Sequence, residues 1–167
     1  MRLIVTDANI FIDMEVGGLL EDMFRLEAWE FVVPDILYVE ELAQAHGQLP
    51  GLGLKVLPLE PALIGEAVAF HQRYPKPSIN DLLALVLAKA QGCPLLSGDS
   101  SLSAAAKAEA VAVHGTLWLM EVLASELAID PGRIEVAYER MRAEGRRLPW
   151  SEGGCGRKFG RLSSVRK

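Results

Sequence analysis

The chain has 167 residues, of which 50% are hydrophobic and 23% are charged, a composition typical of one globular domain with a full core. Its longest apolar runs, such as residues 82–88, are far shorter than the roughly 20 residues that a membrane span requires. The first residues also lack the long apolar region of a signal peptide. We therefore expect a cytoplasmic protein that has no contact with a membrane.

The net charge of -5 conceals two regions of opposite charge. Residues 1–145 contain 10 Lys and Arg against 21 Asp and Glu, whereas residues 146–167 contain 7 against 1. We expect an acidic domain over 1–145 and a basic, flexible C-terminal tail over 146–167. Such a tail is either a solvated terminus or a segment that contacts nucleic-acid phosphates. The basic residues assigned to such contacts are Arg146, Arg147, Arg157, Lys158 and Arg161.

The cysteines and histidines of this sequence predict neither a disulfide framework nor a zinc site. Cys93 and Cys155 are far apart, and the second lies in a glycine-rich stretch, so a disulfide framework is not expected. The three histidines have none of the spacings of a zinc site. Carboxylates are therefore the residues to follow along the chain.

The first expected strand, Arg2–Thr6, is a continuous apolar run, which favours the centre of a parallel sheet. Asp7 and Asn9 follow it directly, before an apolar helix begins. Asp7 taken alone would be a helix N-cap, because Asp is favoured at that position. Asp13, further along the same helix, is expected on its solvated surface.

Helical spacing over 19–29 is followed by a second strand at 31–33 and by a helix that starts at Pro34. Its apolar face is expected to include Val39 and Leu42, and it carries Glu40 and Glu41. At about 100° per residue, Glu40 flanks this face and Glu41 lies nearly opposite, so periodicity favours Glu40 as the more buried glutamate. A solvated pair of charges is the simpler interpretation of both.

The composition of residues 48–55 predicts a Pro/Gly loop. After it we expect a short strand at 56–57 and a helix over 60–73 that has Val68 on its core side. Ser78 and Asp81 then have the spacing of a capping box. The helix they open, 79–90, is apolar around nearly its whole circumference, so Asp81 lies beside the core.

A further strand over 94–97 ends at Gly98 and Asp99, and Asp99 is also placed to cap the helix that follows. The last expected elements are a strand at 111–114 and helices over 116–128 and 130–144. This alternation predicts an α/β fold with three α/β/α layers and a mostly parallel central sheet of four to five strands.

The acidic residues converge at one edge of such a sheet. Asp7 and Asp99 follow strands, and Asp81 begins a helix that runs antiparallel to the strand after it. The carboxyl ends of parallel strands are where α/β sheets bind ligands. Clustered carboxylates cannot all ionise cheaply without a cation, and ligation by oxygen alone suits Mg²⁺ or Mn²⁺. Hydrolysis of a nucleic-acid phosphodiester is the chemistry that such a site supports.

Four segments, TDANIFID, VVPDILYVEEL, SINDLLALVLAKAQG and PLLSGDSSL, resemble the PIN-domain nucleases of bacteria and archaea in their order and spacing, from about Arg2 to Gly115. The resemblance implies a PIN fold and a Mg²⁺- or Mn²⁺-dependent ribonuclease. It also implies site residues, four catalytic acids of which the three aspartates bind metal and two supporting polar residues: Asp7, Glu41, Asp81 and Asp99, with Asn9 and Ser97.

The resemblance selects Glu41 rather than Glu40, because Leu37, Val39 and Leu42 match the apolar positions around the family's glutamate. Two departures stand out. Ser100 and Ser101 occupy positions where many members have a second acid, so one metal ion is expected rather than two. Ala8 replaces a common hydroxyl residue.

The resemblance further suggests the toxin of a toxin–antitoxin pair, with RNA as substrate, an antitoxin protein as partner and assembly into a homodimer or a higher homo-oligomer. The alternative is a catalytically weak or inactive PIN-like module that binds RNA or protein, which the missing second acid favours. A phosphatase or receiver domain with Asp7 as phosphoryl acceptor ranks below both, because no Asp-x-Asp-x loop or receiver lysine is present.

Overall fold

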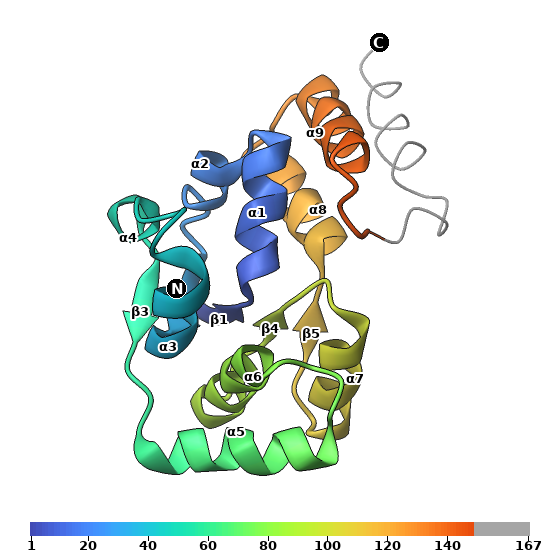
Figure 1. Ribbon diagram of the computed structural model, residues 1–167. Helices are drawn as coiled ribbons and strands as arrows, with labels where there is room; N and C mark the ends of the chain where they lie inside the picture. The colour runs from blue at the N-terminus through green and yellow to red at the C-terminus, as the bar shows by residue number, and fades with distance from the viewer. Residues whose placement is uncertain (149–167) are drawn as a thin grey trace.

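A parallel five-stranded sheet forms the centre of the structure, a computed structural model that describes residues 1–148 (Figure 1). The strand order is β3-β2-β1-β4-β5, and every adjacent pair is parallel. The strands are β1 (Arg2–Thr6), β2 (Trp29–Pro34), β3 (Lys55–Leu57), β4 (Leu95–Leu96) and β5 (Val113–His114). The expected α/β class with a parallel sheet of four to five strands is confirmed.

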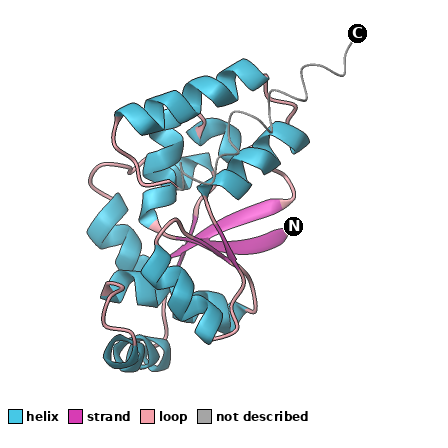
Figure 2. Cartoon of the chain, turned by 90° about the vertical axis from the view of Figure 1, so that its right-hand side faces the viewer, coloured by secondary structure: helices cyan, strands magenta, loops and turns pink. Residues whose placement is uncertain are grey.

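Helices lie on both sides of the sheet (Figure 2). In chain order they are α1 (Ala8–Gly17), α2 (Leu20–Met23), α3 (Asp35–Leu37), the π-helix η1 (Tyr38–Leu42), α4 (Leu49–Leu52), α5 (Pro61–Arg73), α6 (Ile79–Gln91), α7 (Ser100–Ala108), α8 (Thr116–Glu126) and α9 (Pro131–Ala143). Within residues 1–148, no helix is long and apolar enough to cross a membrane.

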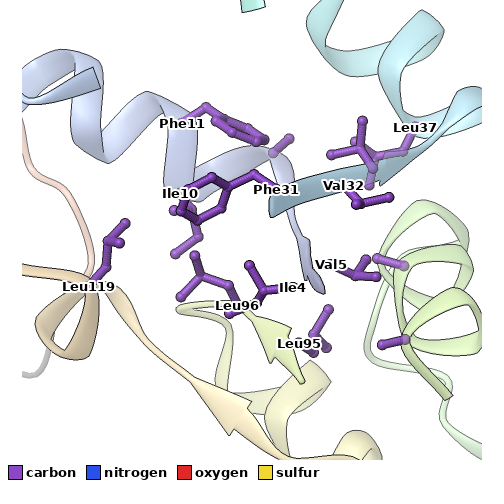
Figure 3. Close-up of a cluster of buried hydrophobic side chains, with 14 of the residues drawn as sticks. Ile4, Val5, Ile10, Phe11, Phe31, Val32, Leu37, Leu95, Leu96 and Leu119 are labelled. Atoms are coloured by element: carbon purple, nitrogen blue, oxygen red, sulfur yellow. The ribbon is translucent and has the colours of Figure 1, made fainter. Parts of the chain in front are cut away.

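The register of the central strands determines where the site lies. β1 pairs with β4 through Val5 with Leu95 and Thr6 with Leu96, so both strands end at the same level. The side chains of these four residues are fully buried because helices cover both faces of the sheet, and Figure 3 shows the surrounding core. Asp7 and Ser97, the next residues along the two strands, are consequently neighbours at the carboxyl edge, where the Asp7 N–H donates to the Leu96 carbonyl at 3.0 Å.

Helix α6 is buried on most sides because it lies between the sheet and α5. It packs against β1, β2 and β4 on one side, and α5 lies along its outer side (Figure 1). Residues 82–88 are all buried, as the apolar circumference predicted. The expected core position of Val68 on α5 is wrong, since this residue is 49% exposed.

The segment after β2 departs from the predicted α-helix. Three residues of α3 lead directly into η1, in which the Ala43 N–H donates to the Tyr38 carbonyl five residues earlier at 2.8 Å. This π-helical spacing buries Leu37 and Leu42 completely and leaves Val39 68% exposed. The predicted apolar face was therefore wrong at Val39, because the calculation assumed 3.6 residues per turn.

Other boundaries also differ from expectation, and the strands expected over 94–97 and 111–114 are limited to β4 and β5. The helix expected over 19–29 is limited to α2, and Trp29 already belongs to β2. The Pro/Gly segment 48–55 contains α4 rather than loop alone.

At the C-terminal end, α9 packs closely on α1: a Cβ added at Gly17 would lie 3.1 Å from Ala137 Cβ, which leaves little room for a larger residue.

The π-helical register can be tested by truncating two apolar side chains. Leu42→Ala should lower the free energy of unfolding by about 2–5 kcal/mol because it opens a cavity in the core. Val39→Ala should change it by no more than about 0.5 kcal/mol because the side chain is exposed. Urea denaturation measures both. A larger loss for Val39→Ala than for Leu42→Ala would contradict the register.

Candidate metal centre and active site

Three aspartates lie at the carboxyl edge of the sheet, and each takes part in capping a helix. Asp7 precedes α1 and accepts from the Ile10 N–H at 3.3 Å. Asp81 and Ser78 form a reciprocal capping box at the start of α6, with bonds of 3.0 and 3.1 Å. Asp99 precedes α7 and accepts from the Leu102 N–H at 2.8 Å. The capping roles considered from the sequence are all present, and they hold the three carboxylates at the same edge.

Ser97 connects two of these aspartates. Its hydroxyl donates to Asp7 Oδ2 and accepts from the Asp99 N–H at 3.1 Å. Ser97 is only 2% exposed, so water does not compete strongly for these bonds. The loop that carries Asp99 is thereby held against the end of β1. The structure places this predicted supporting residue inside the site.

Asp7 is the most deeply buried of the acids, with 1% of its surface exposed. Burial raises the pKa of its carboxyl group to about 7, and the negative charge of Asp81 adds to the rise. Hydrogen bonds from Ser97 and from the Ile10 N–H oppose this shift without cancelling it. A buried carboxylate at this position therefore requires a nearby positive charge to stay ionised.

Asp81 interacts electrostatically with three other acids of the group, Asp7, Glu41 and Asp99. Burial raises its pKa, as does the negative charge of Asp99. Burial also tends to raise the pKa of Asp99. Hydrogen bonds from Ser101 and Leu102, together with the charge of Arg147, outweigh this effect and lower the pKa below its ordinary value. The Ser101 hydroxyl donates to Asp99 Oδ1 at 2.6 Å. Asp99 is thus the carboxylate most readily ionised in the absence of a metal ion.

Both candidate glutamates face this edge from η1. Burial raises the pKa of Glu41, and the charges of Asp81 and Glu40 raise it further. Glu40 Oε2 accepts a hydrogen bond from Asn80 Nδ2 at 2.8 Å, and Asn80 also offsets part of the rise in the Glu41 pKa. Both side chains are exposed, so periodicity did not separate them by burial. Asn80 thus acts on both glutamates, and the negative charge of Asp81 acts on Glu41.

Asn80 was missed by the sequence reasoning. It is 8% exposed, and its Oδ1 has no hydrogen-bond partner among the described residues. Its position in the first turn of a helix that is apolar on all sides, next to Asp81, was a signal that it would be buried at the site.

Asp13 was expected on the helix surface, and this is wrong because only 4% of it is exposed. Its carboxylate accepts from Thr116 Oγ1 at 2.8 Å and pairs with Arg146 Nε at 2.5 Å. A guanidinium nitrogen of Arg146 also lies 3.4 Å from Oδ1 of the exposed Asn9. The acid interrupts a helix with apolar residues on all sides, which was the overlooked sign of burial.

The basic residues assigned to nucleic-acid contacts divide into two groups. Arg146 and Arg147 follow α9 and lie near the acidic edge, where Arg146 pairs with Asp13 and the charge of Arg147 acts on Asp99. Arg157, Lys158 and Arg161 lie outside the described residues.

Within residues 1–148, no group of three or more His, Cys, Asp or Glu side chains is already arranged to hold a metal ion. The chemistry of the acids nevertheless fits a hard divalent cation, because their donors are all oxygen. Asp7, Glu41 and Asp81 all have raised pKa values, first because burial disfavours their charged forms and then because neighbouring carboxylates add negative charge.

Fold and site together define an α/β protein with an acidic centre at the carboxyl edge of a parallel sheet. The family model described as PIN domain matches residues 4–108. The chain therefore belongs to the PIN domain family, whose members are typically nucleases.

Among solved structures, a chain of a toxin-antitoxin complex from Klebsiella pneumoniae is similar at 24% identity, with a TM-score of 0.46. The match covers 60% of this chain and 89% of that one. No curated protein matches the chain significantly.

The raised pKa of Asp7 makes stability depend on pH. With metal removed by a chelator, the folded protein retains a proton on Asp7 that the unfolded chain has already lost. The free energy of unfolding should therefore fall as pH rises from about 4 to about 7. The shift from 3.8 to about 7 corresponds to a loss on the order of 4 kcal/mol.

Asp7→Asn removes this titration and should flatten that part of the profile. Urea denaturation of both proteins across this pH range measures the difference. Profiles with the same slope would show that Asp7 is ionised normally in the folded state.

Proposed function

We propose that the protein is a metal-dependent endoribonuclease that hydrolyses RNA phosphodiesters. One observation carries this proposal: Asp7 is buried at the end of β1 with its pKa raised to about 7, the charge of Asp81 acts on it, and the Ser97 hydroxyl connects it to the backbone N–H of Asp99. Such a group is costly for a protein to maintain unless its charge is used to bind a cation. Membership of a family that consists mainly of nucleases supports the same conclusion.

Asp7, Asp81 and Asp99 would hold Mg²⁺ or Mn²⁺. When bound there, the cation supplies activation of a water molecule and stabilisation of the negative charge that develops on the phosphodiester. Ser97 orients Asp7 and the Asp99 loop, Ser78 orients Asp81, and Ser101 orients Asp99. These hydrogen bonds limit the rotation of the metal-binding side chains, as expected of groups around a metal centre.

Glu41 would act as a proton acceptor at the same edge. Its raised pKa makes it a stronger base than an ordinary glutamate, and its exposure leaves it accessible to water. The family resemblance also selects Glu41 rather than Glu40 for this role.

We also propose a biological role for this ribonuclease activity. The protein would act on cytoplasmic RNA as the toxin of a toxin–antitoxin pair, as a homodimer or higher oligomer that an antitoxin protein holds inactive. This role rests on the sequence resemblance to small PIN proteins.

A second candidate is a PIN-like module that binds RNA or protein with little or no cleavage. It is favoured by Ser100 and Ser101, which stand where many family members carry another acid, and by Ser101 occupying Asp99 Oδ1. RNA binding with undetectable hydrolysis in the presence of Mn²⁺ would support this candidate.

Cleavage of end-labelled single-stranded and structured RNAs, with Mn²⁺ or Mg²⁺ and then with chelator, tests the proposal. Asp7→Asn and Asp81→Asn should each lower the rate at least about 100-fold, since replacing a ligand costs more than the 10–100-fold typical of residues that only orient one. Asp130→Asn is the matched control, because Asp130 also caps a helix but lies at the start of α9.

The control should cleave like the wild type. Absence of metal-dependent cleavage, or equal activity of Asp7→Asn and Asp130→Asn, would overturn the proposal.

A further inference from the structure

A cavity of about 550 Å³ opens directly beside the acidic edge. Ser97 and Asp99 form one end, and its wall includes His114 and Trp118 from β5 and α8. Two basic side chains, Lys107 of α7 and Arg147 after α9, also line it. Its volume is within the range of about 300–1,000 Å³ that is usual for small-molecule sites.

The aromatic side chains of the wall pack against one another. The rings of His114 and Trp118 are stacked, with centroids 4.1 Å apart and an interplanar angle of 13°. Trp118 also contacts Trp29 edge to face, at 5.2 Å and 86°. Both rings are partly exposed. Because they already contact each other, the binding of a planar group would cost little additional side-chain entropy. The facing sides of the two rings cover each other, so a planar ligand meets the remaining exposed surface of this prearranged pair.

The basic residues give the cavity a second property. The domain is strongly acidic, yet Lys107 and Arg147 lie on this wall, and Lys107 has no ion pair within the described part of the chain. The charge of Arg147 reaches Asp99, so its guanidinium is close to the reacting edge. Cations beside an aromatic surface are the combination that recognises a phosphate attached to a base.

We infer that this cavity binds the nucleotide next to the scissile phosphodiester, with its base against the His114–Trp118 pair and its phosphate against Lys107 and Arg147. This inference rests on the proposed function and assigns the position of one nucleotide of its substrate. A base in a duplex is stacked and paired, so only an unpaired nucleotide enters such a cavity without added cost.

Binding can be measured without cleavage. The full-length protein, kept in EDTA, is titrated with adenosine 5′-monophosphate and separately with inorganic phosphate, and the indole N–H resonance of Trp118 is followed by NMR. The nucleotide should shift this resonance and bind more tightly than phosphate. Trp118→Leu should weaken nucleotide binding about 5- to 100-fold, because stacking on an aromatic side chain contributes about 1–3 kcal/mol per base.

Three further variants separate stacking, charge and folding. Trp118→Phe keeps an aromatic surface and should bind nearly as well as the wild type. Arg147→Gln should weaken both nucleotide and phosphate, whereas Lys76→Gln, an exposed lysine outside the cavity, should weaken neither. Thermal unfolding of each variant verifies that it is folded.

Equal affinity for nucleotide and phosphate, or undiminished nucleotide binding by Trp118→Leu, would overturn the base contact. Undiminished binding by Arg147→Gln would overturn the phosphate contact. RNA cleavage by the same preparations with Mn²⁺ separates the two proposals. Cleavage without nucleotide binding in the cavity refutes this inference alone. Nucleotide binding without cleavage refutes the nuclease proposal, and with it the position next to a scissile phosphodiester, but leaves the base and phosphate contacts standing.

Discussion

The buried carboxylate of Asp7, held by the Ser97 hydroxyl at the end of the central strand pair, is the constraint on which the rest of the site depends. Pairing of β1 with β4 brings the two residues together, and the same hydroxyl accepts the N–H of Asp99. Asp81 then adds a negative charge from the start of α6, a helix buried between the sheet and α5. Each carboxylate makes a stabilising cap for its helix, but together they make an edge that favours a cation.

Much of this arrangement was predictable, because it depends on strand ends and helix starts. Continuous apolar runs identified β1 and β2, and capping patterns identified Asp7, Asp81 and Asp99 as residues fixed at helix N-termini. Parallel strand order then required the three to share an edge. The burial of Asp13 and the exposure of Val39 were not anticipated. The first depends on Thr116 and Arg146, more than 100 positions away, and the second on a π-helix that a period of 3.6 residues does not describe.

The part of the chain beyond the PIN match contributes to the site as well. The match ends at residue 108, whereas α8 and the residues after α9 provide Trp118, Arg146 and Arg147. These side chains place an aromatic surface and positive charge next to an otherwise acidic edge. No spacing motif connects them with Asp99, because only the tertiary packing of α8 and α9 brings them there. The acidic centre thus lies within the PIN match, the cavity also includes residues beyond it, and the two meet at Ser97 and Asp99.

The most direct measurement of the central claim is the NMR titration of the Asp7 carboxyl carbon, first in chelator and then with saturating Mg²⁺. Without metal, the pKa of Asp7 should be near 7. With Mg²⁺ it should fall well below this value, because the cation stabilises the ionised form. A titration curve that Mg²⁺ leaves unchanged would contradict the claim that this carboxylate edge is a metal centre.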